Sequence, residues 1–250
     1  MKKGVNSLKI RVFTDSRIAV AYAAAIVEHV VEAEHHPTLS LATGETPSAL
    51  YAQLVEFHRR GLSFTDVTTV NLDEYVGLPK THAQSYHQYM QEHFFQWIDI
   101  SKDRIFIPNG YVNNLQNECE RYDRILQQHP IDLQILGIGI NGHIGFNEPG
   151  TAFKPTTHIV GLSEETIRSN ARFFNSLNDV PKQAITMGLQ PIMQSKQILL
   201  MAFGEQKAQA VHLALEGDVQ THVPASILQI HPNVTFILDE AVAKACKLNL

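Results

Sequence analysis

The stretch 131–150, I-D-L-Q-I-L-G-I-G-I-N-G-H-I-G-F-N-E-P-G, contains residue types that could transfer protons. An apolar run ends in closely spaced glycines, and His143 and Glu148 follow in the same turn. A histidine titrates near neutral pH, and a carboxylate beside it can orient its ring. The pattern favours an acid–base site, although a glycine-rich turn also tolerates a histidine on purely conformational grounds.

The same stretch carries the spacing Gly-x-Gly-x-x-Gly at Gly137, Gly139 and Gly142, which is typical of dinucleotide-binding folds. That fingerprint needs a helix that opens directly after the glycines. Here Gly145 and Pro149 interrupt any such helix within two turns. The sequence therefore favours an acid–base loop over a nucleotide site.

A second segment, Thr43-Gly44-Glu45-Thr46, connects a predicted strand to a predicted helix. Small and hydroxyl residues at this place leave backbone N–H groups free to hold an anion at the start of the helix. The segment lacks the Gly-Lys-Ser/Thr sequel of a nucleotide-binding P-loop. By itself it is a weak signal for an anion site, and a plain strand-to-helix turn is the alternative interpretation.

A third segment places two carboxylates, Asp73 and Glu74, after another predicted strand. Adjacent carboxylates at a strand end could supply a general base. A helix cap or a solvated turn is the alternative interpretation.

Three cations could complement an anion. Arg168 and Arg172 lie one turn apart on a predicted helix, and Lys207 lies in the first turn of another. A cation near a helix N-terminus opposes the helix dipole, and an anionic ligand would remove that penalty. Arginine is also well suited to bidentate phosphate contacts. Solvated surface cations remain the alternative for all three.

Strands and helices alternate along the whole chain. The predicted strands span 8–14, 38–42, 66–72, 105–108, 131–136, 197–203 and 234–238, and 184–187 is a short apolar piece. The predicted helices span 16–31, 47–59, 85–95, 115–128, 189–194, 205–215 and 240–247, and a further helix starts at 163. This alternation predicts an α/β fold with a mostly parallel sheet and helices on both faces.

Without a linker, repeat or low-complexity tract, we expect one domain over residues 1–250. Ligands of such sheets bind at the carboxyl ends of the strands, so we expect the three segments to converge.

Composition excludes several functional classes. The 250 residues carry a net charge of -5 and no basic block, which argues against nucleic-acid binding. No apolar run approaches the ~20 residues of a membrane helix, and the first residues lack the pattern of an export signal. The two cysteines, Cys119 and Cys246, are too few for a disulfide framework. We therefore expect a cytoplasmic protein that binds neither nucleic acid nor membrane.

The segments together resemble the glucosamine-6-phosphate deaminase family, and the resemblance covers nearly the whole chain in the right order. The shared motifs are L-A-T-G-E-T-P at 41–47, N-L-D-E-Y-V-G-L at 71–78, S-Y at 85–86, G-H-I-G-F-N-E-P at 142–149, N-A-R-F-F at 170–174, G-E-Q-K-A at 204–208 and L-E-G at 215–217. Related phosphogluconolactonases share a glycine-histidine turn but lack the N-E-P carboxylate that follows it here.

The resemblance implies a hydrolase of amino-sugar catabolism that converts glucosamine 6-phosphate and water to fructose 6-phosphate and ammonia. It implies a Rossmann-like sheet, no metal and no cofactor, and a mobile lid around 156–181. By position, Asp73 resembles the base that moves a proton between C2 and C1. His143 resembles the group that opens the sugar ring, oriented by Asn141 and Glu148. The resemblance places the phosphate at Thr43, Gly44, Glu45, Thr46, Arg172 and Lys207.

Two positions depart from the pattern of some family members. Asn141 stands where they have aspartate, and an asparagine adds no negative charge beside His143. Members with asparagine occur in the shorter bacterial branch, so we expect activity. His158 and Val160 stand where allosterically activated hexamers carry basic residues. We therefore expect no activation by an N-acetylated sugar phosphate, in a monomer or small homo-oligomer.

Two alternatives remain open at this point. The first is a different enzyme on the same fold, either a sugar-phosphate lactonase or an isomerase. The second is a sugar-phosphate sensor domain, which would need a DNA-binding segment for which the chain has no basic stretch. Release of ammonia from glucosamine 6-phosphate separates the predicted deaminase from both.

Overall fold

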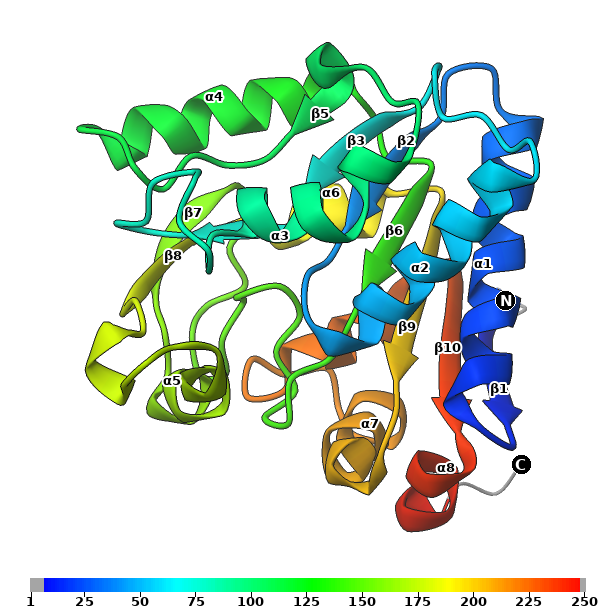
Figure 1. Cartoon of the computed structure of the whole chain (residues 1–250). Coiled ribbons are helices and arrows are strands. Elements are labelled where there is room, and N and C mark those ends of the chain that lie inside the picture. Colours follow the sequence, from blue (N-terminus) through cyan, green and yellow to red (C-terminus); the bar gives the residue numbers. More distant parts are fainter. Residues whose placement is uncertain (1–6, 248–250) are drawn as a thin grey trace, which may run out of the picture.

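The computed structural model describes residues 7–247 and centres on a seven-stranded, fully parallel sheet (Figure 1). The strand order is β1-β10-β9-β6-β2-β3-β5. The strands are β1 (Ser7–Phe13), β2 (Thr38–Leu41), β3 (Thr68–Asn71), β5 (Ile105–Phe106), β6 (Leu133–Leu136), β9 (Gln197–Ala202) and β10 (Asn233–Asp239). The predicted parallel α/β fold is confirmed. The first residues, where we saw no export signal, and the last three lie outside the described residues.

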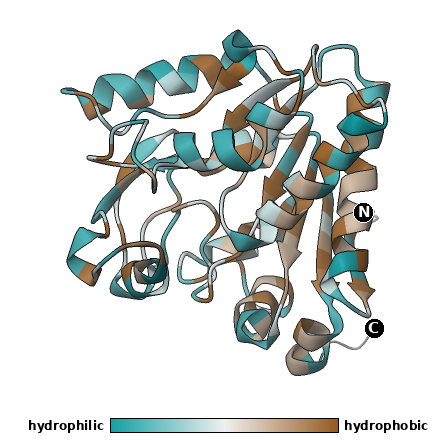
Figure 2. Ribbon diagram, in the orientation of Figure 1, coloured by the Kyte–Doolittle hydropathy of each residue, from teal (hydrophilic) through white to brown (hydrophobic). Residues whose placement is uncertain are grey.

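Helices cover both faces of this sheet, as predicted. They are α1 (Ser16–Ala33), α2 (Glu45–Arg59), α3 (Tyr86–His93), α4 (Leu115–Gln128), α6 (Leu189–Gln194), α7 (Ala208–Glu216) and α8 (Glu240–Cys246), whereas α5 (Glu164–Asn170) packs at a second sheet described below. Buried residues of α1, α2 and α3 form one apolar cluster with one side of the strands. Buried residues of α4, α6, α7 and α8 form a second cluster with the other side. Hydrophobic residues accordingly concentrate on the central strands (Figure 2). This double burial explains why a strand such as β9 is apolar on both faces.

A second, three-stranded antiparallel sheet was not predicted. It consists of β4 (Asp73–Tyr75), β8 (Gln183–Thr186) and β7 (His158–Gly161), in the order β4-β8-β7. We expected 73–75 to be the end of the preceding strand, before a turn at 76–79, and 151–162 to be loop-like or weakly extended. Instead the chain leaves the parallel sheet after β3 and forms β4, which pairs with β8 so that Asp73 lies opposite Thr186. Three residues are too short for a periodicity signal, and distant partners stabilise the strand.

The small sheet carries its own apolar cluster. Tyr75, Phe146 and Ala184 are buried in it, together with Val160 and Leu162. This cluster joins β4 to the loop after β6 and to the start of the predicted lid. Beyond β7 the lid segment continues through α5 and two short 3-10 helices, Ala171–Phe173 and Leu177–Asp179. The small sheet thus connects the lid segment to the strand that bears Asp73.

Candidate active site

Four neighbouring strands of the parallel sheet supply the predicted site. In the order β9-β6-β2-β3, each strand is followed at its carboxyl end by one of the segments singled out in the sequence (Figure 1). Lys207 follows β9, His143 follows β6, Glu45 follows β2 and Asp73 follows β3. Sequence reasoning expected these segments to converge, and the strand order makes them neighbours.

The loop after β6 folds back tightly around His143. The N–H of Gly139 donates to the carbonyl oxygen of His143 at 2.9 Å, and the N–H of Gly142 donates to the carbonyl of Gly139 at 3.0 Å. Gly142 and Gly145 have φ angles of 87° and 56°, a backbone region that other residues rarely adopt. The glycines are therefore required by a tight loop, and no helix opens after them.

Within this loop His143, Glu148 and Asn141 are in contact. Nδ1 of His143 lies 3.6 Å from Oε2 of Glu148, a distance suited to an ion pair but too long for a strong hydrogen bond. The Asn141 amide donates to the same oxygen at 3.1 Å and accepts the N–H of His143 at 3.2 Å. Asn141 thus bridges the backbone of His143 and the carboxylate of Glu148.

The carboxylate of Glu148 is held in its charged form. Its side chain is only 4% exposed. Burial alone would raise its pKa, but His143 and hydrogen bonds from Thr166 and Ser163 outweigh burial and lower the pKa to about 2. An ionised carboxylate in this position can stabilise a protonated imidazole and orient the ring of His143.

Asp73 behaves in the opposite way. Burial, followed by the negative charge of Glu74, raises its pKa to about 8. The carboxyl group faces the glycine loop, because a Cβ placed on Gly145 would stand 3.4 Å from Oδ2 of Asp73. A carboxyl group with a pKa close to neutrality can both accept and return a proton, which is what a general base in an isomerisation needs.

The neighbouring Glu74 has a different task. Its carboxylate accepts the N–H groups of Tyr75, Tyr86 and His87 at 2.8, 3.0 and 3.1 Å, and it contacts Nδ1 of His87 at 2.8 Å. Glu74 therefore caps α3, as one sequence interpretation allowed, whereas Asp73 faces the loop. Successive residues of a strand point to opposite sides, which separates the two roles.

The 43–46 segment presents the N-terminus of α2. Gly44 precedes the helix with a φ of 113°, and its carbonyl oxygen accepts the hydroxyl of Tyr89 at 2.6 Å. In a trans peptide the N–H points away from the carbonyl, so Tyr89 turns the N–H of Glu45 to the opposite side. The first N–H groups of a helix have no partner inside the helix and attract anions.

One of the three predicted cations contacts the first residue of α2, and a second lies within range of the charges there. Nη1 of Arg172, in the 3-10 helix Ala171–Phe173, lies 3.0 Å from Oε1 of Glu45. Nζ of Lys207 donates to the carbonyl oxygen of Ile138 at 2.7 Å, and burial and the nearby Arg172 lower its pKa. Arg168 instead pairs with Glu164 at 3.2 Å on the surface. Arg172 and Lys207 therefore form the cationic side of the site.

Sequence reasoning missed several residues that contact the site. Thr166 and Ser163 hydrogen-bond to Glu148, and Asn170 donates to the hydroxyl of Tyr75 at 2.8 Å. Ser163 carried a local signal only as the first residue of a predicted helix, and Asn170 only as part of the N-A-R-F-F motif. The other contacts join residues that are far apart in sequence, so no spacing rule could indicate them.

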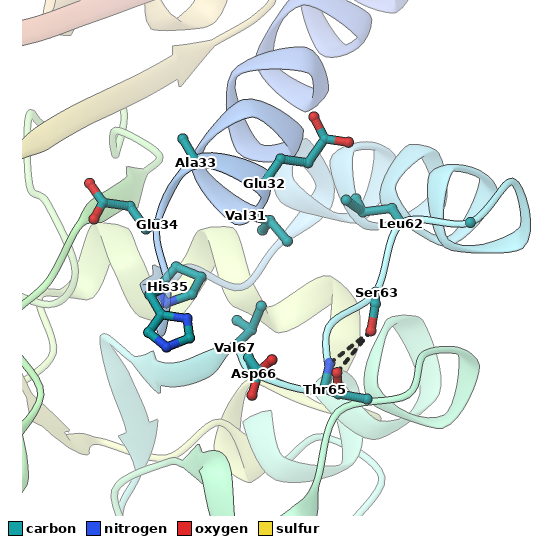
Figure 3. A pocket seen from close by; sticks show the side chains of 12 residues that line it. Val31, Glu32, Ala33, Glu34, His35, Leu62, Ser63, Thr65, Asp66 and Val67 are labelled. Atoms are coloured by element: carbon teal, nitrogen blue, oxygen red, sulfur yellow. Dashed lines mark hydrogen bonds between the residues drawn. The ribbon is translucent and has the colours of Figure 1, made fainter.

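A separate cavity lies at the opposite end of the sheet. It has a volume of about 530 Å³ and is lined by residues around the end of α1 and the turn before β3, including Glu34, His35 and Asp66 (Figure 3). These residues precede β2 and β3, whereas the candidate site follows them. Within residues 7–247, no group of three or more His, Cys, Asp or Glu side chains is arranged to hold a metal ion. The described helices also include none that is long and apolar enough to cross a membrane.

A parallel α/β sheet whose carboxyl edge joins a buried carboxyl group, a histidine loop and a cationic helix N-terminus defines an enzyme for small anionic substrates. A family model described as glucosamine-6-phosphate isomerases/6-phosphogluconolactonase matches residues 14–237. The chain belongs to this family, and the sequence-based family assignment is confirmed.

Individual relatives are similar over almost their full length. The glucosamine-6-phosphate deaminase of Bacillus velezensis is 52% identical over 223 residues, which cover 88% of this chain and 92% of that protein. The glucosamine-6-phosphate deaminase of Lactobacillus delbrueckii subsp. bulgaricus is 53% identical over 210 residues, covering 84% and 88%.

Solved structures agree with the fold. A structure described as a monomeric glucosamine-6-phosphate deaminase has a TM-score of 0.93 and 46% identity, covering 95% of this chain and 100% of that chain. The 6-phosphogluconolactonase of Trypanosoma brucei has a TM-score of 0.77 at 19% identity, covering 95% and 98%. The second similarity concerns the fold alone.

Proposed function

We propose that the protein converts glucosamine 6-phosphate and water to fructose 6-phosphate and ammonia, in the catabolism of amino sugars. The observation that carries this proposal is that two carboxyl groups with opposite pKa shifts follow strands at the same edge of the sheet. Asp73 has its pKa raised to about 8, and Glu148 has its pKa lowered to about 2. One group can exchange a proton near neutral pH while the other stays charged beside His143.

The anion site would bind the phosphate. The N-terminus of α2 at residues 43–46 supplies backbone N–H groups, and Arg172 and Lys207 supply charge. A dianion held there is remote from the reacting carbons, so its binding energy can orient the sugar. The Glu45 side chain is itself an anion paired with Arg172, and the phosphate would replace it in that pair.

The reaction then follows from the two acid–base groups. His143 transfers a proton between the anomeric hydroxyl and the ring oxygen, which opens the sugar. Asp73 removes the proton from C2 and returns it to C1, which turns the aldose into a 2-imine. Water adds to C2 and the nitrogen leaves as ammonia, so the net reaction consumes one water and is a hydrolysis.

We place the lid at 156–181. Its closure would keep bulk water from the enolamine that precedes the imine. The cytoplasm is the proposed compartment, and the two free, buried cysteines are compatible with it. The similarity to a deaminase described as monomeric supports a monomer, and the substitutions at His158 and Val160 support the absence of allosteric activation.

The direct test measures the ammonia and fructose 6-phosphate that the protein forms from glucosamine 6-phosphate. A separate assay offers 6-phosphogluconolactone as the alternative substrate. Asp73→Asn should abolish turnover and keep substrate binding, since only the proton carrier changes. Asp218→Asn, an exposed aspartate, is the matched control. Near-normal kcat in Asp73→Asn contradicts the assigned base, and lactone hydrolysis without ammonia release contradicts the proposed reaction. Rate curves that are sigmoidal and become hyperbolic with N-acetylglucosamine 6-phosphate contradict the absence of activation.

A further inference from the structure

The two oxygens of the Glu148 carboxylate face different parts of the molecule. Oε2 faces the acid–base loop, where it contacts Asn141 and His143. Oε1 faces α5 in the lid segment, where it accepts the hydroxyl of Thr166 at 2.6 Å. The N–H of Ser163 adds a longer contact to Oε1 at 3.4 Å. One buried carboxylate therefore joins the histidine to the lid.

The direction of these hydrogen bonds is fixed. An ionised carboxylate can only accept, so the Thr166 hydroxyl must donate to Glu148. The same hydroxyl oxygen is then the acceptor for the Ser163 hydroxyl at 2.9 Å, and Ser163 Oγ accepts the N–H of Thr166 at 3.1 Å. Thr166 is buried, with 3% exposure, so water does not compete for this bond. A short hydrogen bond to a charge is among the stronger ones in proteins.

We propose that Thr166 is a positioning residue for the reaction: it holds Glu148 beside His143 while α5 is seated over the loop. This inference rests on the proposed function. Glu148 can contribute to ring opening only when Oε2 faces the imidazole of His143. The hydrogen bond from Thr166 to Oε1 restricts rotation of the carboxylate and so keeps Oε2 in that position.

The arrangement also connects phosphate binding to the acid–base loop. Arg172 lies six residues after Thr166 in the same segment and reaches the N-terminus of α2. Between them, Asn170 holds the segment to Tyr75 of β4. A phosphate that engages Arg172 favours the seated position of α5, and that position places the Thr166 hydroxyl on Glu148. Binding energy from the phosphate is thereby used to orient a group near the sugar ring.

The test is a double-mutant cycle between Thr166→Val and Glu148→Gln, measured by ammonia release. Thr166→Val keeps the shape and removes the donor, and we expect kcat to fall about tenfold or more while KM for glucosamine 6-phosphate changes about twofold or less. Thr166→Ser, which restores a hydroxyl, should recover most of kcat. In the Glu148→Gln background the valine should cost no more than about twofold in kcat, because its effect acts through Glu148.

Arg168→Gln is the matched control, since it removes only the surface ion pair with Glu164 on the same helix and leaves every contact of Glu148 in place. We expect kcat and KM to stay within about twofold of wild type in this variant, in both the wild-type and the Glu148→Gln background. Equal kcat in wild type and Thr166→Val, or a full valine effect in the Glu148→Gln background, overturns the inference. Thr166→Ala, which adds no bulk, replaces the valine in the same cycle if that variant does not fold. A wild-type protein that releases no ammonia overturns the proposed function instead.

Discussion

Gly139 lies directly against the imidazole ring of His143. A Cβ atom on Gly139 would stand 2.5 Å from both Cε1 and Nδ1 of that ring, closer than any real contact. The backbone N–H of Gly139 also donates to the carbonyl of His143, which fixes the fold-back of the loop. The ring position is therefore set by the absence of a side chain four residues earlier.

We expect Gly139→Ala to lower kcat by about 100-fold, because a displacement of about 1 Å at a catalytic group can cost that much. Gly137→Ala is the matched control, since a Cβ there meets nothing within 4 Å. Ammonia release and the melting temperature of both variants check the prediction. An equal loss of kcat in both would mean that the contact with His143 is unimportant.

Asp73→Asn should stabilise the protein in a pH-dependent way. In the folded protein the pKa of Asp73 is raised from 3.8 to about 8, so between these values the folded state holds a proton that the unfolded chain has lost. Stability therefore falls as pH rises through this window, and it falls no further above it. The variant lacks this loss, so its Tm advantage over wild type should grow between about pH 5 and pH 8. A constant advantage contradicts the raised pKa.

The raised pKa of Asp73 also predicts a pH-dependent rate. As a general base Asp73 acts when ionised. The plot of kcat/KM against pH should therefore have a rising limb with its midpoint near pH 8, and kcat/KM should level off above it. Glu74→Gln removes the negative charge that contributes to the shift, so this limb should move to lower pH. His87→Gln removes a partner of Glu74 and leaves its charge, so it should not lower the limb. A limb that stays unmoved in Glu74→Gln rules out the electrostatic role of Glu74.

Glu45→Gln should tighten phosphate binding. In the free protein the Glu45 carboxylate is paired with Arg172 at 3.0 Å and competes with a phosphate for it. Both side chains are more than half exposed, so a few-fold effect is expected, larger at low ionic strength. The inhibition constant of inorganic phosphate measures it. Glu56→Gln, whose carboxylate pairs with Arg59 at the far end of the same helix, should leave that constant unchanged.

Much of the fold is predictable from local patterns. Long apolar strands such as β9 and amphipathic helices such as α4 produce signals within single windows of sequence, because each buries its own side chains on the sheet. The glycine loop is also readable, since Pro149 and Gly145 exclude the helix of a nucleotide fingerprint. The roles of Asp73, His143, Glu148 and Asn141 and of the phosphate residues stay predictions.

The small sheet and the partners of the site were not readable in the same way. Asp73 pairs with Thr186, and Glu74 caps a helix that starts twelve residues later. Sequence left open whether 73–74 formed a base or a cap, and the structure gives each residue a separate environment. Strand alternation turns Asp73 towards the loop and Glu74 towards α3, once β8 has fixed the strand.

By itself, the sequence determined the order of the helices and of the strands of the parallel sheet along the chain, the glycine turn around His143 and the kinds of side chain at each strand end. These features depend on backbone preference and on local periodicity. Only the tertiary structure decided that Arg172 and not Arg168 contacts the start of α2, that burial raises the pKa of Asp73, and that the Thr166 hydroxyl donates to Glu148. Burial, charge proximity and hydrogen bonding between distant segments exist only after the chain has folded, because each depends on neighbours that no local pattern specifies.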